Sequence, residues 1–210
     1  MKTIMISIVL LFKSYIHDSN ANDQILLKKL ISKIEEVEFD NSDKFMSSTY
    51  CYYIFQKIIN ANEITPKIFS KFIKGGSLSL KYAKEYRDWL KTSEGVSCKD
   101  SVGPSFTAFK IPKNKEYAIF LNKPAILMEG KDISMTRGHE RLHIAFAIYK
   151  EQQYKVQKKW DTLSEDKKKK FISEHPGYNF QKKKVLLKEF FSYSYQEDLE
   201  AGLTFLTSQQ

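Results

Sequence analysis

Apolar residues recur at helical spacing along the first ninety residues. Between residues 23 and 38 they stand at positions 26, 27, 30, 31, 34 and 37, which is the period of one helix face. The segment ITPKIFSKFIKGG has Thr65 as a candidate N-cap, Pro66 at a first helical position and Gly75 as a candidate C-terminal cap. This part of the chain therefore predicts four helices, over residues 23–38, 42–61, 65–75 and 78–92.

The pattern shortens after the Ser/Gly-rich connector TSEGVSCKDSVGPS. The runs SFTAFKI, EYAIFLN and PAILMEG are short and rich in aromatic or aliphatic residues, and turn-forming residues bound them, so they predict strands. We expect IPKNKE to join the first two as a hairpin-like turn. Three more helices should follow, over about 135–160, from the N-cap Ser164 to before Pro176, and over 181–206.

The predicted fold class is therefore α+β and mainly helical, with N-terminal helices, a small sheet and C-terminal helices. We divide the chain into an N-terminal helical segment, 22–96, and a second region, 97–210. One continuous domain over 22–210 is the alternative.

The N-terminus MKTIMISIVLLF has a basic Lys2 followed by an apolar run that is too short to span a bilayer. The small-residue pattern Ser19-Asn20-Ala21 follows it. This order predicts a signal peptide over residues 1–21, with cleavage after Ala21, and a secreted or periplasmic protein. A short buried N-terminal element is the alternative.

Charge and cysteine content add two expectations. The formal net charge of +9 favours attraction to an anionic envelope surface, although the runs EDKKKKF and FQKKKV are typical of solvated helix faces. No specific nucleic-acid motif and no transmembrane span accompany them. In an oxidising compartment the two cysteines, Cys51 and Cys98, predict one disulfide. A buried free thiol is the alternative for Cys51.

The stretch TRGHERLHIA carries the strongest chemical signal. His139 and His143 are four residues apart on a predicted helix, so they face the same way and can reach one metal ion. Glu140 is rotated by about 100° from His139, so it flanks the metal, where it can hold a metal-bound water and take its proton. Zn²⁺ at such a site acidifies the water and polarises a carbonyl. The alternative is a pair of surface histidines.

Through HERLH, an H-E-x-x-H motif, the sequence resembles the zincin metallopeptidases over its second half. The resemblance implies a zincin-like catalytic region over 97–210 and an edge strand above the site that binds extended substrate, either EYAIFLN or PAILMEG. Metzincins have a Gly and a third His where this chain has Phe146 and Tyr149, so the sequence departs from that branch.

Gluzincins instead take their third ligand from a later helix, and Glu189 in LLKEFFSYSYQ is the expected one. A carboxylate on a predicted buried face needs a partner, and a metal is one. Glu197 and Glu200 lie in the acidic QEDLE, and His175 lies in a helix-ending turn. These three remain alternative ligands.

Tyr193 is the expected donor to a transition-state oxyanion, with Tyr195 and His175 as alternatives. The sequence thus predicts a hydrolase, a secreted zinc metallopeptidase of gluzincin type that acts on peptide or protein substrates. Two alternatives stay open. One is a basic envelope or host-surface binding protein that keeps the fold without turnover, and the other is a peptidoglycan amidase.

Overall fold

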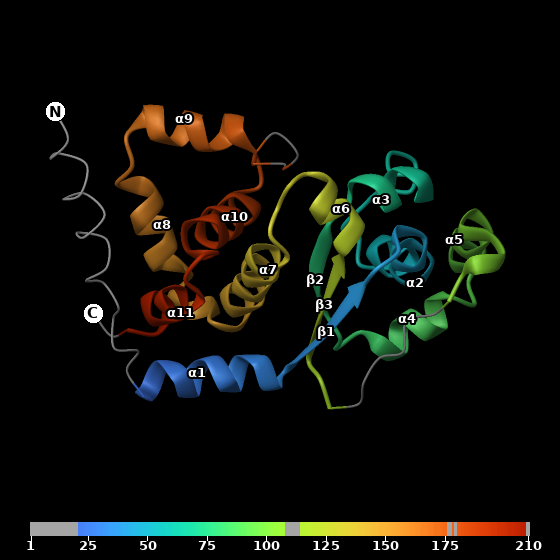
Figure 1. Cartoon of the computed structure of the whole chain (residues 1–210), viewed down its shortest axis with the longest axis horizontal. Helices are drawn as coiled ribbons and strands as arrows, with labels where there is room; N and C mark the ends of the chain where they lie inside the picture. Colours follow the sequence, from blue (N-terminus) through green and yellow to red (C-terminus); the bar gives the residue numbers. More distant parts are fainter. Residues whose placement is uncertain (1–20, 108–113, 176–177, 179, 209–210) are drawn as a thin grey trace, which may run out of the picture.

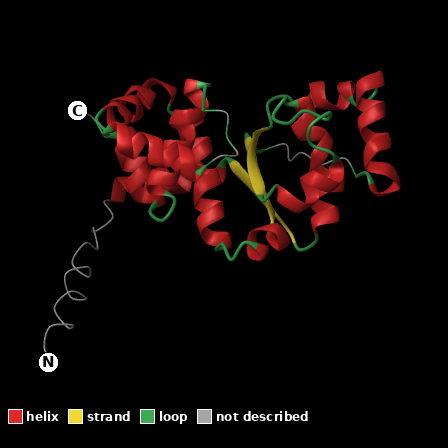
Figure 2. Cartoon of the chain, turned by 90° about the horizontal axis from the view of Figure 1, so that it is seen from above, coloured by secondary structure: helices red, strands yellow, loops and turns green. Residues whose placement is uncertain are grey.

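A three-stranded sheet stands between two groups of helices (Figure 1, Figure 2) in the computed structural model, which describes residues 21–107, 114–175, 178 and 180–208. The central strand is β3 (Tyr117–Asn122). The strand β1 (Ile34–Phe39) pairs parallel to it, and β2 (Gly75–Ser79) pairs antiparallel along its other side. The predicted mainly helical α+β fold is confirmed.

The helices form two groups, which we call the disulfide half and the site half. The disulfide half contains α2 (Ser42–Phe55), α3 (Pro66–Phe72), α4 (Ala83–Trp89) and α5 (Ser93–Val102). The site half contains α1 (Ala21–Ser32), α7 (Ile133–Ile148), α8 (Gln153–Asp161), α9 (Glu165–Glu174), α10 (Lys183–Tyr195) and α11 (Leu199–Thr207). The short α6 (Lys123–Met128) touches elements of both groups.

Each face of the sheet packs against a separate hydrophobic core. Side chains alternate across a strand, so Ile119 and Leu121 of β3 enter the core of the site half. Their neighbours Ala118 and Phe120 enter the core of the disulfide half. Leu30 belongs to the first core and Val102 to the second, so neither core follows the boundary between residues 96 and 97.

The helix expected over residues 23–38 is wrong in its second half, because α1 ends at Ser32 and β1 begins at Ile34. The stretch IEEVEF alternates between the two faces of the sheet. Its Glu36 accepts two hydrogen bonds from Arg141 of α7, at 2.6 and 3.0 Å. Pairing with β3 and with α7 therefore outweighs the local helical preference.

Two predicted helix caps are confirmed and one is wrong. The Thr65 and Ser164 hydroxyls accept the backbone N–H groups that start α3 and α9. Gly75 does not cap α3. It begins β2, because the backbone N–H of Asn122 in β3 already bonds the Lys74 carbonyl, at 2.6 Å.

Several other predicted boundaries also change. The connector over 92–105 contains α5, which the Thr92 hydroxyl caps. PAILMEG is not a strand, because Pro124 stands at the start of α6, where its missing N–H costs nothing. EYAIFLN is a strand, but it is the central one and not an edge.

The two long C-terminal helices are each divided. The helix expected over 135–160 is split between α7 and α8, and that over 181–206 between α10 and α11, where Asp198 caps α11. In the segment SFTAFKI, residues 108–111 lie outside the described residues, and residues 105–107 form no strand. The first half of the expected turn, residues 111–113, also lies outside them.

A disulfide joins Cys51 of α2 to Cys98 of α5, with the Cα atoms 5.9 Å apart, as predicted. Apart from Ala21, the expected signal peptide lies outside the described residues. In the part of the chain that the structure describes, no helix has the length and apolarity needed to cross a membrane.

Candidate metal centre

The motif helix α7 runs between the sheet and α10 (Figure 1). The Asp132 carboxylate caps its start by accepting the Ser134 N–H at 2.7 Å. Leu142, Ala145 and Phe146 are buried in the site-half core and fix the rotation of the helix. The motif residues His139, Glu140 and His143 lie on a second buried face of α7, and each is at most 8% exposed. The alternative of two surface histidines is therefore wrong.

Helix α10 places Glu189 beside both histidines. Its neighbours Phe190 and Phe191 are buried in the core, and Glu189 itself is 1% exposed. One carboxylate oxygen, Oε2, lies 3.2 Å from His139 Nε2 and 3.1 Å from His143 Nε2. Glu189 follows His143 by 46 residues in the sequence, and the packing of α10 on α7 brings the two side chains together.

The buried group of His139, Glu140 and His143 can hold a metal ion. Glu189 Oε2 lies within hydrogen-bond distance of both Nε2 atoms, so it is a fourth polar group at the same site. Ligand atoms on a tetrahedral zinc are about 3.3 Å apart, so these two distances are also compatible with a shared metal ion.

Glu140 occupies a different place from Glu189. Its Oε2 lies 3.2 Å from Nδ1 of His143, on the side of the ring away from Glu189. The two atoms are in ion-pair contact, and this buried oxygen has no hydrogen-bond partner among the described residues. Glu140 therefore lies beside the two imidazoles with His143 as its one ionic contact there, in reach of a proton that a neighbouring group gives up.

The electrostatics favour ionised carboxylates here. Burial alone would raise the pKa of Glu189, but His139, His143 and the charge of Lys188 hold that pKa well below its usual range. Burial acts in the same way on Glu140, and His143, His139 and Lys188 together lower its pKa. Both groups are thus carboxylates at neutral pH.

The two imidazoles differ from each other. Burial and the neighbouring His143 lower the pKa of His139. For His143, burial and Lys188 act to lower the pKa, but Glu140 and Glu189 outweigh them and raise it. His139 is accordingly the more readily neutral ring, which is the form that binds a metal.

Tyrosines and a lysine line the rest of the centre. The Tyr193 ring lies 4.5 Å from that of His139, between centroids, and its hydroxyl is 3.5 Å from the Tyr178 hydroxyl. The Lys188 ammonium lies 3.3 Å from Oε1 of Glu189, the oxygen that faces away from the imidazoles. This contact leaves Oε2 alone to face both Nε2 atoms.

The other predicted candidates lie elsewhere. His175 is the C-cap of α9, and its Nδ1 lies 2.7 Å from the Phe171 carbonyl oxygen. Its ring lies against the Tyr193 ring, with the centroids 3.9 Å apart. The Tyr195 hydroxyl accepts a hydrogen bond from Lys159. Glu197 is exposed and lines a separate hollow of about 330 Å³. Glu200 lies in the first turn of α11 and forms no ion pair with a described residue.

Three residues near the centre were missed from the sequence, namely Tyr53, Tyr178 and Lys188. Tyr53 of α2 is buried, its hydroxyl has no hydrogen-bond partner among the described residues, and burial together with the charge of Glu140 raises its pKa well above the usual value. The Gly75-Gly76 pair was the available signal, since glycine in a strand often marks a close approach. A Cβ on Gly76 would lie 2.2 Å from the Tyr53 hydroxyl.

Comparisons of this chain with protein-family models, with curated proteins and with solved structures found no match.

Proposed function

We propose that this protein is a zinc-dependent metallopeptidase of the gluzincin type. The observation that supports the proposal is that Glu189 Oε2 lies 3.2 Å from His139 Nε2 and 3.1 Å from His143 Nε2. These are three protein ligands, the number that a catalytic zinc site uses while it keeps one position open. Zinc bound there would acidify a water molecule and polarise a substrate carbonyl.

The chain's own residues supply the remaining steps of amide hydrolysis. Glu140 is ionised, and its Oε2 contacts His143 without a hydrogen bond, so it takes the proton of the attacking water and passes it to the leaving amine. The Tyr193 hydroxyl stays protonated, because burial raises its pKa, and it donates a hydrogen bond to the developing oxyanion.

An extended substrate could pair with an edge strand beside α7. The expected edge strand was EYAIFLN or PAILMEG, but the edge strands are β1, which α7 reaches through the Arg141–Glu36 pair, and β2, against which α7 packs more extensively. The Lys74 carbonyl accepts from Asn122 of β3, and the Leu80 N–H donates to Glu116 just before β3, so the alternating backbone groups of Gly75 and Ser77 face away from the sheet. We infer that a peptide adds to this edge as a further strand.

The test is metal analysis of the purified protein followed by cleavage of a denatured casein with and without a zinc chelator. One bound zinc per chain and chelator-sensitive cleavage, restored by added zinc, would support the proposal. Bound zinc without cleavage of casein would favour the binding-protein alternative, and release of peptidoglycan amides alone would favour the amidase. A protein that takes up no zinc would refute the peptidase and the amidase, and would leave the binding protein.

A further inference from the structure

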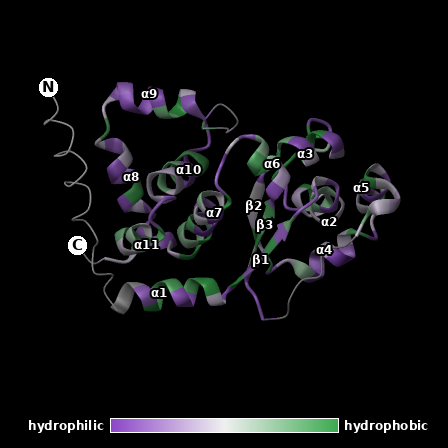
Figure 3. Cartoon of the chain, viewed as in Figure 1, coloured by the Kyte–Doolittle hydropathy of each residue, from purple (hydrophilic) through white to green (hydrophobic). Residues whose placement is uncertain are grey.

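The positive charge of this chain is concentrated in one part of the site half. We call residues 150–184 the basic arm, because they hold eleven lysines against five acidic residues. The arm therefore carries a net charge of +6 out of the +9 of the whole chain. It comprises α8, α9 and the start of α10, and Figure 3 shows α9 as mostly hydrophilic.

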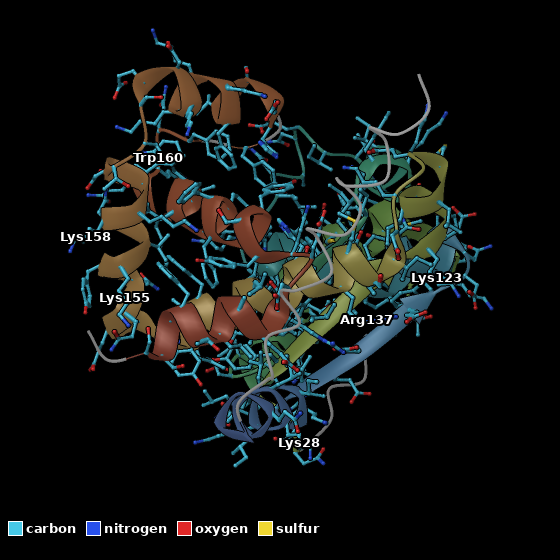
Figure 4. The ribbon with its side chains drawn as sticks, turned by 60° about the vertical axis from the view of Figure 1, so that its left-hand side comes forward. Lys28, Lys123, Arg137, Lys155, Lys158 and Trp160 are labelled. Carbon is cyan, nitrogen blue, oxygen red and sulfur yellow. A yellow bond between two sulfur atoms is a disulfide. The ribbon has the colours of Figure 1, made fainter. Side chains whose placement is uncertain are left out.

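Part of this charge is used inside the fold and part is free. The Lys155 ammonium is buried and donates to the Leu206 carbonyl at the end of α11, and that of Lys159 lies 4.3 Å from the Tyr195 ring centroid. In Figure 4, α8 carries Lys155 and Lys158, and α9 extends its side chains outward. Seven exposed lysines of the arm form no ion pair with a described residue: Lys150, Lys158, Lys167, Lys169, Lys182, Lys183 and Lys184.

The basic arm is next to the candidate metal centre, because it packs against α10 and continues into it. Phe171 of α9 packs against Phe190 and Tyr193 of α10, with ring centroids 5.7 and 6.1 Å apart. Lys184 is one helical turn before Lys188, whose ammonium contacts Glu189. A bound chain that leaves the centre along α10 would therefore pass the free lysines.

We propose that the basic arm binds an acidic stretch of the polypeptide substrate next to its scissile bond, an inference that rests on the proposed peptidase function. Every basic residue of the arm is lysine. Lysine is a point charge that accepts carboxylates in many orientations, whereas base recognition in nucleic acids relies largely on forked arginine contacts. A helix that lies on a membrane needs a broad apolar face, and in α9 Phe171 is turned inward and only Ile172 is exposed.

The experiment compares two labelled peptides with the same apolar centre. One is flanked by glutamates, and its twin has glutamine at each of those positions. Fluorescence anisotropy with the full chain, zinc-loaded and carrying E140Q to prevent cleavage, should show the glutamate peptide binding about tenfold or more tightly at low salt. The difference should shrink as salt rises, because free charges are screened.

Two triple variants with equal charge change locate the effect. K167E/K169E/K183E changes the arm, and K28E/K44E/K84E changes exposed lysines of α1, α2 and α4. Circular dichroism checks that each is folded. The arm variant should lose the preference for the glutamate peptide, and the control variant should keep most of it.

Equal binding of the two peptides, or equal loss in both variants, would overturn the inference. So would tighter binding of phosphatidylserine vesicles than of the glutamate peptide through the same lysines. If the protein with Glu140 unchanged cleaves both peptides at equal rates, and the two peptides bind with equal affinity, the arm does not bind the substrate. The proposed peptidase activity would still stand. If the glutamate peptide binds through the arm but no peptide is cleaved, the proposed peptidase activity is wrong. The proposal that the arm binds a substrate is then wrong as well.

Discussion

Two buried carboxylates stand close to the same pair of imidazoles, and their contacts give them different roles. Glu189 faces the Nε2 atoms of both rings through one oxygen. Glu140 meets only the Nδ1 side of His143, and its Oε2 has no hydrogen-bond partner among the described residues. In the proposed function, the first contact would make Glu189 a ligand and the second would leave Glu140 as the proton acceptor.

Glu140→Gln should keep one zinc per chain and lose hydrolysis by about two to four orders of magnitude, because the amide cannot accept the proton. Metal analysis and initial rates of peptide cleavage measure the two effects separately. Full activity in this variant would rule out Glu140 as the base.

Glu189→Ala should lower zinc affinity by about tenfold or more, since it removes a direct ligand. Glu197→Ala is the matched control, because this carboxylate is exposed and lines the separate hollow, which contains neither imidazole. Competition with a chromogenic chelator gives both affinities. The reverse ranking would mean that Glu189 is not the third ligand.

The residues of the centre were predictable to the extent that spacing or local context marks them. The interval between His139 and His143 places both on one face, and the apolar neighbours of Glu189 indicate a buried carboxylate. Nothing local marks Lys188 or Tyr53. Their positions depend on how α10 and α2 pack against α7 and β2, which is tertiary information.

At the scale of the elements, β2 meets α2 closely at two tyrosines: the Tyr52 hydroxyl donates to the Ser79 carbonyl at 2.7 Å, and Tyr53 lies against Gly76. Gly76 leaves room for the Tyr53 hydroxyl, which is buried beneath the strand. Helix α2 is in turn fixed to α5 by the disulfide. The strand proposed to bind substrate is thus supported from behind by the disulfide half.

Gly76→Ala should lower the free energy of unfolding by about 1–3 kcal/mol, because the new methyl group overlaps the hydroxyl. Adding Tyr53→Phe should restore much of the loss, since it removes the overlapping atom and breaks no hydrogen bond of a described residue. Tyr50→Phe is the control and should not rescue, because the Tyr50 hydroxyl bonds the Ile64 carbonyl. Urea unfolding of the single and double variants measures the effect.

Replacing both cysteines by serine should lower the free energy of unfolding by up to about 4 kcal/mol, the chain-entropy value for a loop of this length. The two residues are 47 apart in sequence. Urea unfolding of oxidised protein, reduced protein and the double variant gives the comparison. Before reduction, intact mass should be two protons lower than for free thiols.

Element boundaries were less predictable than the elements' existence. The sequence of β1 has a helical pattern that only its pairing with β3 and Arg141 overrides. PAILMEG has strand-like composition, yet Pro124 fits the first turn of α6. Short apolar runs satisfy either structure, and the neighbours decide.

On the scale of the whole molecule, the shared sheet joins the two cores. Each half contains one of the chain's two tryptophans, Trp89 against Tyr86 in the disulfide half and Trp160 against Phe190 in the site half. Loss of either core would expose one face of β3. We therefore expect the halves to unfold together.

W89F and W160F each leave one tryptophan to report on one half. In each variant the fluorescence and far-UV circular dichroism transitions should coincide, and zinc should shift both tryptophan signals. At a free zinc concentration of about a hundred times Kd, the added stability should be about 2.7 kcal/mol. Two separate transitions, or a zinc shift seen only by Trp160, would contradict a single cooperative unit.

The disulfide also bears on which metal-binding groups the chain can offer. Thiolates are strong zinc ligands, and Cys51 and Cys98 both precede His139 in the chain. During synthesis they emerge before any of the three proposed ligands, so their bond can close first. Once oxidised, the chain has no thiol left to capture zinc in a misfolded state, and the incoming ion meets only imidazoles and carboxylates.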